Sequence, residues 1–188
     1  QGTLGELFIS SHGVALDPET AIVNKVLLKD TDLSLCLNDT TAADTAKTDT
    51  TYWKIILQNI DLQNVSFALQ MPLDSLTLST SLAKASLRNG LIDLHKSAYS
   101  LQSFKIENGQ VNYDSGAPSP LLSDSIALRG LDPSHIALTG IGVQLDSLHY
   151  EGRDMKAIIN RFVLKERSGL EIQSTQGRLL SNKQSLRI

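Results

Sequence analysis

Cysteine is nearly absent from this 188-residue chain, in which Cys36 is the single example. An intramolecular disulfide is therefore excluded, and the cysteine count leaves the redox compartment open. Aromatic residues make up only 5% of the sequence, so any apolar cavity would be lined by aliphatic side chains. No stretch of 18 apolar residues occurs, and the first residues lack the basic and then apolar pattern of a signal peptide. We expect a longer protein of which this chain is a segment, with any membrane contact made outside these residues.

Clustered positive charge is also missing. The formal net charge is −3, and lysine and arginine are scattered without aromatic residues between them. Nucleic-acid binding needs a concentrated positive surface, so the sequence predicts no nucleic-acid partner. Apolar residues make up 41% and charged residues 20% of the chain, which is typical of a folded protein.

Residue patterns of catalytic and metal sites are absent as well. The four histidines (His12, His95, His135 and His149) lie far apart and have no companion at a metal-ligand spacing. The chain contains neither a Gly-x-Ser-x-Gly nucleophile motif nor a glycine-rich phosphate loop. We therefore expect no enzyme activity, no metal and no cofactor.

Alternation of apolar and polar residues dominates the sequence. Val65, Phe67, Leu69 and Met71 alternate with more polar neighbours, which is the pattern of a half-buried β-strand. Two segments, 38–51 and 115–120, break the alternation and are predicted loops. Asp17-Pro18 favours the start of a short helix that continues through 21–24, with proline at the first helical position. The sequence otherwise predicts a single all-β segment over 1–188, an antiparallel meander of short hairpins with at most one or two short helices.

Internal repetition supports the hairpins. The segment 85–94 (ASLRNGLIDL) aligns with 104–113 (FKIENGQVNY), and each places an Asn-Gly pair between two apolar-x-apolar units. Because Asn and Gly tolerate the positive φ of a type I′ turn, we expect turns at Asn89-Gly90 and Asn108-Gly109. Leu87 would then face Ile92, and Ile106 would face Val111. A looser copy occupies 26–35, and Asp-Ser-apolar-x-apolar units at 74–78, 124–128 and 146–150 are predicted to follow turns with a strand.

These hairpins would place their apolar residues on one face. If this face stays open, its residues are candidates for lining a groove. The predicted members are Leu87, Ile92, Leu94, Phe104, Ile106, Val111 and Tyr113. Alternation alone is compatible with two structures: a sandwich whose two sheets pack about 10 Å apart, or an elongated curved sheet whose apolar face holds acyl chains.

The repeat style resembles a known family. The apolar-x-apolar-x-Asn-Gly hairpins, the Asp-Ser-Leu-x-Leu segments and the pentad steps over 55–67 (IILQNIDLQNVSF) are similar to the repetitive β regions of the TamB and AsmA family of Gram-negative envelope proteins. The stretch 162–172 (FVLKERSGLEI) resembles segments of the TamB-like translocation and assembly proteins of the Bacteroidetes.

The resemblance implies a half-pipe-shaped β region in the periplasm, in a long protein anchored in the inner membrane. It implies an apolar groove for phospholipid transport between the inner and outer membranes, with acyl chains as the partner. The alternative is a chaperone-like scaffold that offers strand edges to outer-membrane β-barrel proteins during their assembly or secretion. The family contributes no catalytic residue to this sequence.

Overall fold

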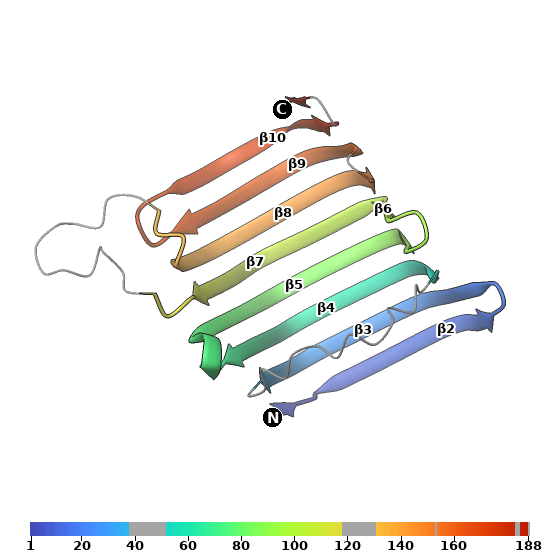
Figure 1. Cartoon of the computed structure of the whole chain (residues 1–188), viewed down its shortest axis with the longest axis horizontal. Helices are drawn as coiled ribbons and strands as arrows, with labels where there is room; N and C mark the ends of the chain where they lie inside the picture. The colour runs from blue at the N-terminus through green and yellow to red at the C-terminus, as the bar shows by residue number, and fades with distance from the viewer. Residues whose placement is uncertain (38–51, 118–130, 153, 183–184, 188) are drawn as a thin grey trace, which may run out of the picture.

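The chain forms one large curved β-sheet in the computed structural model (Figure 1). The structure describes residues 1–37, 52–117, 131–152, 154–182 and 185–187. About 80% of the structure is strand, and the described residues contain no α-helix, only a single turn of 3₁₀-helix, η1 (Pro72–Asp74). The predicted all-β class is confirmed.

Eleven strands make up the sheet, and several are far longer than the five or six residues of an ordinary strand. Their bounds are β1 (Gly2–Thr3), β2 (Glu6–Leu16), β3 (Glu19–Cys36), β4 (Lys54–Met71), β5 (Leu76–Asp93), β6 (Ala98–Leu101), β7 (Ser103–Asp114), β8 (His135–Glu151), β9 (Asp154–Glu166), β10 (Glu171–Ser181) and β11 (Leu186–Arg187).

Neighbours in the sheet mostly follow the order of the chain. From β4 onward neighbouring strands pair antiparallel. The short strand β6 and the strand β7 do not pair with each other but lie in line, and each pairs with β5 on one side and β8 on the other. The exception is the parallel pair of β3 and β4, in register from Thr20 opposite Lys54 to Cys36 opposite Gln70. The predicted meander is therefore correct for most of the sheet and wrong at this one pair.

Neither face of the sheet is covered by a second layer of described residues (Figure 1). Among these residues the buried apolar side chains are all alanines, namely Ala85, Ala98 and Ala157. The accessible surface of the chain is 12900 Å², against about 8,900 Å² expected for a compact protein of its mass. The sandwich is therefore excluded for the described part of the chain, and the sheet is open.

The two predicted Asn-Gly hairpins are wrong. Asn89-Gly90 lies inside β5, and Asn108-Gly109 lies inside β7. The repeats do not fold back on themselves but pair with each other, with Ala85 opposite Ile106 and Leu87 opposite Phe104. The looser copy over 26–35 likewise lies within β3.

The turn-forming residues instead act as extra residues within long strands. Positive φ falls on the asparagines, 49° at Asn89 and 53° at Asn108, and Asp30 and Asn64 adopt the same conformation. At each of these places one residue of each strand is left out of the pairing. For example, Lys29 pairs with Gln63 and Thr31 pairs with Val65, whereas Asp30 and Asn64 between them are left out. Because one residue in the left-handed region interrupts the alternation, the following apolar residue returns to the same face of the sheet. This explains the pentad steps, in which 55, 57, 60, 62, 65 and 67 all share one face.

Gly90 and Gly109 do not have positive φ, and a side chain at either position would come close to aliphatic neighbours. A Cβ atom added to Gly109 would lie 3.2 Å from Ile106 Cγ2, 3.3 Å from Ile141 Cβ and 3.4 Å from Leu82 Cδ2. A Cβ atom added to Gly90 would lie 2.8 Å from Leu87 Cδ2. The space beside each glycine is thus lined by aliphatic side chains of its own strand and of a neighbouring strand.

The remaining local predictions have mixed outcomes. The predicted helix over 21–24 is wrong, because these residues belong to β3. The Asp-Ser unit at 74–78 does end a turn before β5, whereas the unit at 146–150 lies within β8 and the unit at 124–128 lies outside the described residues. The predicted loop 38–51 also lies outside them. Of the loop 115–120, residues 115–117 are described and are not in a strand.

Candidate ligand-binding face

One face of the sheet is lined by apolar side chains that form continuous rows across the strands. In an antiparallel pair, and in a parallel pair in register, paired residues point to the same side. The register can therefore be followed from strand to strand. One row, running from β2 to β9, consists of Ile9, Val26, Ile60, Leu87, Phe104, Leu145 and Ile159. A neighbouring row consists of Leu7, Leu28, Leu62, Ala85, Ile106, Val143 and Phe162.

Six of the seven predicted groove residues belong to this apolar face. Leu87 and Ile92 come from β5, and β7 contributes Phe104, Ile106, Val111 and Tyr113. The seventh, Leu94, lies in the turn after β5, outside the strands, where its amide donates a hydrogen bond to the Trp53 carbonyl at 3.0 Å. Six of the seven residues thus lie on one side of the sheet, through a strand pairing that differs from the predicted hairpins.

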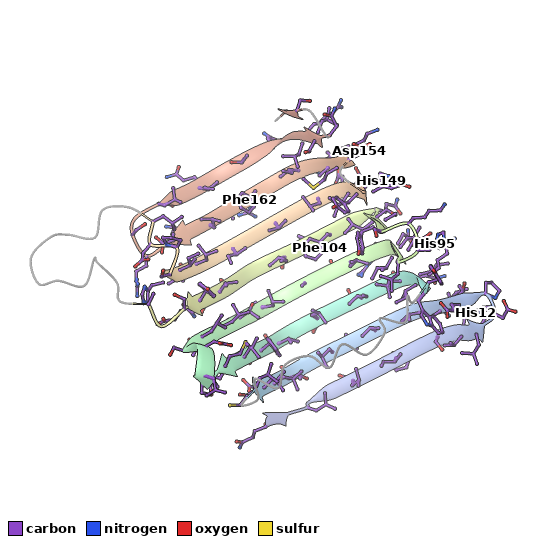
Figure 2. All side chains as sticks on the ribbon, in the orientation of Figure 1. His12, His95, Phe104, His149, Asp154 and Phe162 are labelled. Carbon is purple, nitrogen blue, oxygen red and sulfur yellow. The ribbon has the colours of Figure 1, made fainter. Side chains whose placement is uncertain are left out.

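The apolar face extends over more strands than predicted. It extends over β3 and β4 through residues such as Val26 and Ile60, and over β8 and β9 through Leu145 and Phe162. Figure 2 shows Phe104 near the middle of the sheet and Phe162 on β9, nearer to the β10 edge. The pentad spacing of β4 carried this information, because it keeps the apolar residues of that strand, apart from Ile56 and Ala68, on one side.

Side chains of the apolar face are only partly covered. The large residues of β4, β5 and β7 are intermediate in exposure, because strand neighbours cover their sides and nothing described covers their tops. Exposure rises toward β2, where Leu7 is 50% and Ile9 59% exposed. A contiguous apolar surface of this extent is rare on a soluble monomer and marks a surface that binds a partner or ligand.

The opposite face is mainly polar and charged over the central strands. Arg88 Nη2 contacts Asp61 Oδ1 at 2.5 Å, and Lys105 forms an ion pair with Glu107. These groups border a hollow of about 220 Å³ that also includes Lys84. The hydrogen bond and positive charge of Lys105 hold the pKa of Glu107 below its ordinary value. This face resembles an ordinary solvated sheet surface.

The histidines do not form a metal site among the described residues. His12, His95 and His149 lie on different strands or turns near one end of the sheet (Figure 2). His149 Nε2 lies 3.7 Å from Glu151 Oε2 on an exposed strand. The residues that the structure describes contain no group of three His, Cys, Asp or Glu side chains able to hold a metal ion. None of the described segments is a helix long and apolar enough to cross a membrane.

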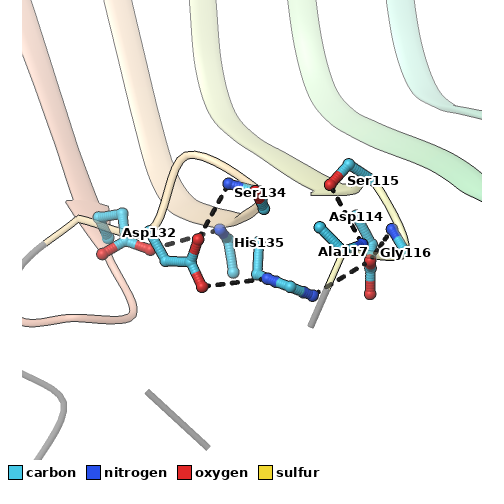
Figure 3. Close-up of polar contacts among 9 residues, drawn as sticks. Asp114, Ser115, Gly116, Ala117, Asp132, Ser134 and His135 are labelled. Atoms are coloured by element: carbon cyan, nitrogen blue, oxygen red, sulfur yellow. Dashed lines mark hydrogen bonds and ion pairs between the residues drawn. The ribbon is translucent and has the colours of Figure 1, made fainter. Parts of the chain in front are cut away.

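His135 belongs to a polar cluster at the other end of the sheet (Figure 3). Its Nδ1 lies 3.0 Å from Asp132 Oδ2, and its Nε2 lies 3.4 Å from Asp114 Oδ1. Asp132 also accepts a hydrogen bond from the Ser134 amide at 3.0 Å, and Asp114 accepts one from the Gly116 amide at 2.7 Å. The cluster ties the end of β7 to the start of β8, which gives these carboxylates a structural role.

Glu166 is the one buried charged residue among those described, with 6% of its surface exposed. Burial alone would raise its pKa. The Ser168 side chain and amide, together with the Ala137 and Arg167 amides, outweigh burial and hold the pKa of Glu166 below its ordinary value. The Ser168 amide lies 2.6 Å from Oε2. The carboxylate thus caps the turn between β9 and β10 and gives no sign of a catalytic role.

Comparison with known proteins places this chain in no family. No protein-family model matches it, and neither curated proteins nor solved structures yield a match.

Proposed function

We propose that this chain is a non-catalytic segment of a long envelope protein of the TamB and AsmA type, and that its apolar face binds phospholipid acyl chains. The observation that carries the lipid-binding part is the unbroken apolar face of a sheet with no second layer among its described residues. The family and the periplasmic location rest on the resemblance of the pentads and repeats.

The dimensions of the face suit acyl chains. The 18-residue strands β3, β4 and β5 are about 59 Å long at 3.3 Å per residue. Half of a bilayer's hydrocarbon core, the depth occupied by one acyl chain, is about 15 Å. A chain lying on the face would therefore contact aliphatic side chains along its whole length in any direction within the sheet.

The chemistry of the face also suits acyl chains better than a rigid polar ligand. Its rows are aliphatic residues with scattered aromatic rings, and its hydrogen-bonding groups are few between the ends of the strands. Such a surface gives affinity through burial of apolar area, at about 25 cal/mol per Å², without selecting one chemical structure. Transport of mixed phospholipids would need this lack of selectivity.

A second candidate function is a scaffold for outer-membrane proteins. The observation that favours it is the outer edge of β2, which pairs with no other described strand than β3 and carries exposed aliphatic residues. An extended segment of a client protein could add to this edge as a further strand.

Ile106→Asp tests the lipid-binding proposal. Ile106 lies in the middle of the apolar face, between Ala85 and Val143, and it is partly exposed. On an open face the new carboxylate reaches water, so we expect the variant to fold, with an unchanged far-ultraviolet circular dichroism spectrum. We expect the phospholipid that co-purifies with the protein, measured by native mass spectrometry, to fall several-fold.

Ser86→Asp is the matched control. Ser86 lies one residue from Ala85, on the opposite face, where it pairs with Lys105. The substitution adds the same charge at almost the same place in the sheet and should leave lipid binding unchanged. A folded Ile106→Asp variant that retains full lipid binding would contradict the proposal.

A photo-crosslinking residue at position 106 of the full-length protein separates the two candidates in cells. Crosslinks to phospholipid support the lipid-binding proposal. Crosslinks to proteins alone favour the scaffold.

A further inference from the structure

The edge strand β2 has few of the charged residues and none of the prolines by which proteins often prevent a sheet edge from pairing. Residues 6–16 include no proline, lysine or arginine, and Glu6 is their single carboxylate. Several of their apolar side chains are largely exposed, among them Ile9 (59%), Val14 (62%) and Leu16 (79%). A long apolar edge of this kind is a template for pairing with another strand.

The opposite edge of the sheet is protected. Strand β10 is mostly polar, and its register with β9 is irregular at two places between Ile172 and Gly177. Its last residues, Leu180 and Ser181, are already paired with β11. Both edge strands have register irregularities, but the polar and charged side chains of β10 discourage pairing, so among the described strands β2 is the more available edge.

The aliphatic residues of β2 on the apolar face are also spaced symmetrically about the middle of the strand. Leu7, Ile9 and Ser11 lie on the apolar face before an irregularity at Ser10–Gly13, and Val14 and Leu16 lie on it afterwards. Two copies could pair antiparallel about a twofold axis between residues 11 and 12. The numbers of any two residues that lie opposite each other then add up to 23. Leu7 then faces Leu16 of the second copy, and Ile9 faces Val14.

The same register matches the other face of β2. Phe8 would face Ala15 of the second copy, and Ser10 would face Gly13, and all four of these residues lie on the polar side of the sheet. In this register all ten residues from Leu7 to Leu16 are paired, and every aliphatic residue of the apolar face meets another one. A register shifted by two residues in one direction would place Ile9 opposite His12 and Leu16 opposite Gly5. A shift in the other direction would place Val14 opposite Ser11 and Leu7 opposite Pro18.

We infer that the partner of the β2 edge is a second copy of this chain, paired through β2 in this register. The twofold axis is perpendicular to the sheet, so both copies present their apolar faces on the same side and form one face of twice the width. The contact is isologous and therefore closes at two copies. The inference does not depend on lipid binding, because it rests on the edge and not on the face.

Two double variants test the register. In Ile9→Lys with Val14→Lys, each new lysine would face a lysine of the second copy, whereas in Ile9→Lys with Val14→Glu each lysine would face a glutamate. Both side chains are more than half exposed, so both variants should fold, which circular dichroism checks. Because two cross-strand pairs change from repulsive to attractive, the Lys/Glu variant should dimerise about tenfold more tightly than the Lys/Lys variant.

Sedimentation velocity of the whole chain over a range of concentrations measures both dissociation constants. Ile9→Lys with Leu16→Glu is the register control, because position 9 does not face position 16 of the second copy, and it should not recover dimerisation. A wild-type chain that stays monomeric throughout would overturn the inference. So would equal affinities of the Lys/Lys and Lys/Glu variants, or growth beyond the dimer, which indicates pairing of β2 with a different edge.

Discussion

Single asparagine and aspartate residues decide which side of the sheet each segment presents. Asp30, Asn64, Asn89 and Asn108 all have positive φ inside strands. Asn and Asp enter this conformation more easily than other residues with a side chain, because their short polar side chains can hydrogen-bond locally. Two of these residues also contact each other, because Asn64 Nδ2 of β4 donates a hydrogen bond to Asp30 Oδ1 of β3 at 2.8 Å. The apolar face thus depends on residues that are themselves polar.

Substitution of Asn108 tests this role. Valine is β-branched and disfavours the φ of 53° found there, so Asn108→Val should destabilise the fold by about 1–3 kcal/mol. Asn108→Gly removes the side chain but tolerates this φ, and it serves as the control. Thermal unfolding should show a midpoint lowered by about 2–10 °C for valine and a much smaller change for glycine. Equal effects of the two substitutions would show that φ is not the constraint.

At the scale of elements, the turn between β9 and β10 depends on a buried carboxylate. Glu166 lies opposite Leu138 in the register and accepts hydrogen bonds from the Ser168 and Ala137 amides. Because its pKa is lowered in the folded state, the folded chain binds fewer protons than the unfolded chain near and below the ordinary value of 4.5. The stability that Glu166 contributes is therefore present above that value and lost as the pH falls through the lowered pKa.

Glu166→Gln should remove this contribution. At pH 7 the variant should be less stable by about 1–3 kcal/mol, because the charged hydrogen bonds are lost and an amide group faces backbone donors. The difference between the two proteins should shrink as the pH is lowered from 5 to 3. Denaturant unfolding at a series of pH values measures it. A difference that stays constant down to pH 3 would contradict the role of the ionised carboxylate.

At the scale of the whole molecule, the sheet is stable without burying large side chains completely. In the part of the chain that the structure describes, each strand is covered by its neighbours within the sheet and neither face carries a second layer, and the surface of the chain is 12900 Å². Half-burial of many aliphatic side chains replaces a central core. The consequence is a large apolar surface that remains available for a ligand.

This architecture predicts an unusual response to denaturant. The slope of the unfolding free energy against denaturant concentration is proportional to the surface exposed on unfolding. Because the folded chain already exposes about 4,000 Å² more than a compact protein of its mass, the slope should be roughly a fifth smaller than for such a protein. Guanidinium titration of the lipid-free protein at low concentration measures it. A slope typical of a compact domain of this length would indicate that the faces are covered in solution.

Local sequence determined the β class, the alternation and most members of the apolar face, because each depends only on the side-chain period of a strand. The pentads of β4 even specified where its extra residues fall. The tertiary structure alone decided the role of the Asn-Gly pairs, since positive φ serves a tight turn and an interrupted strand equally well. Leu87 pairs with Phe104 and not with Ile92 because the whole of β7 lies beside residues 77–88 of β5. The parallel pairing of β3 with β4 and the open, single-layer sheet were decided in the same way, by contacts between residues distant in the sequence, which local alternation does not encode.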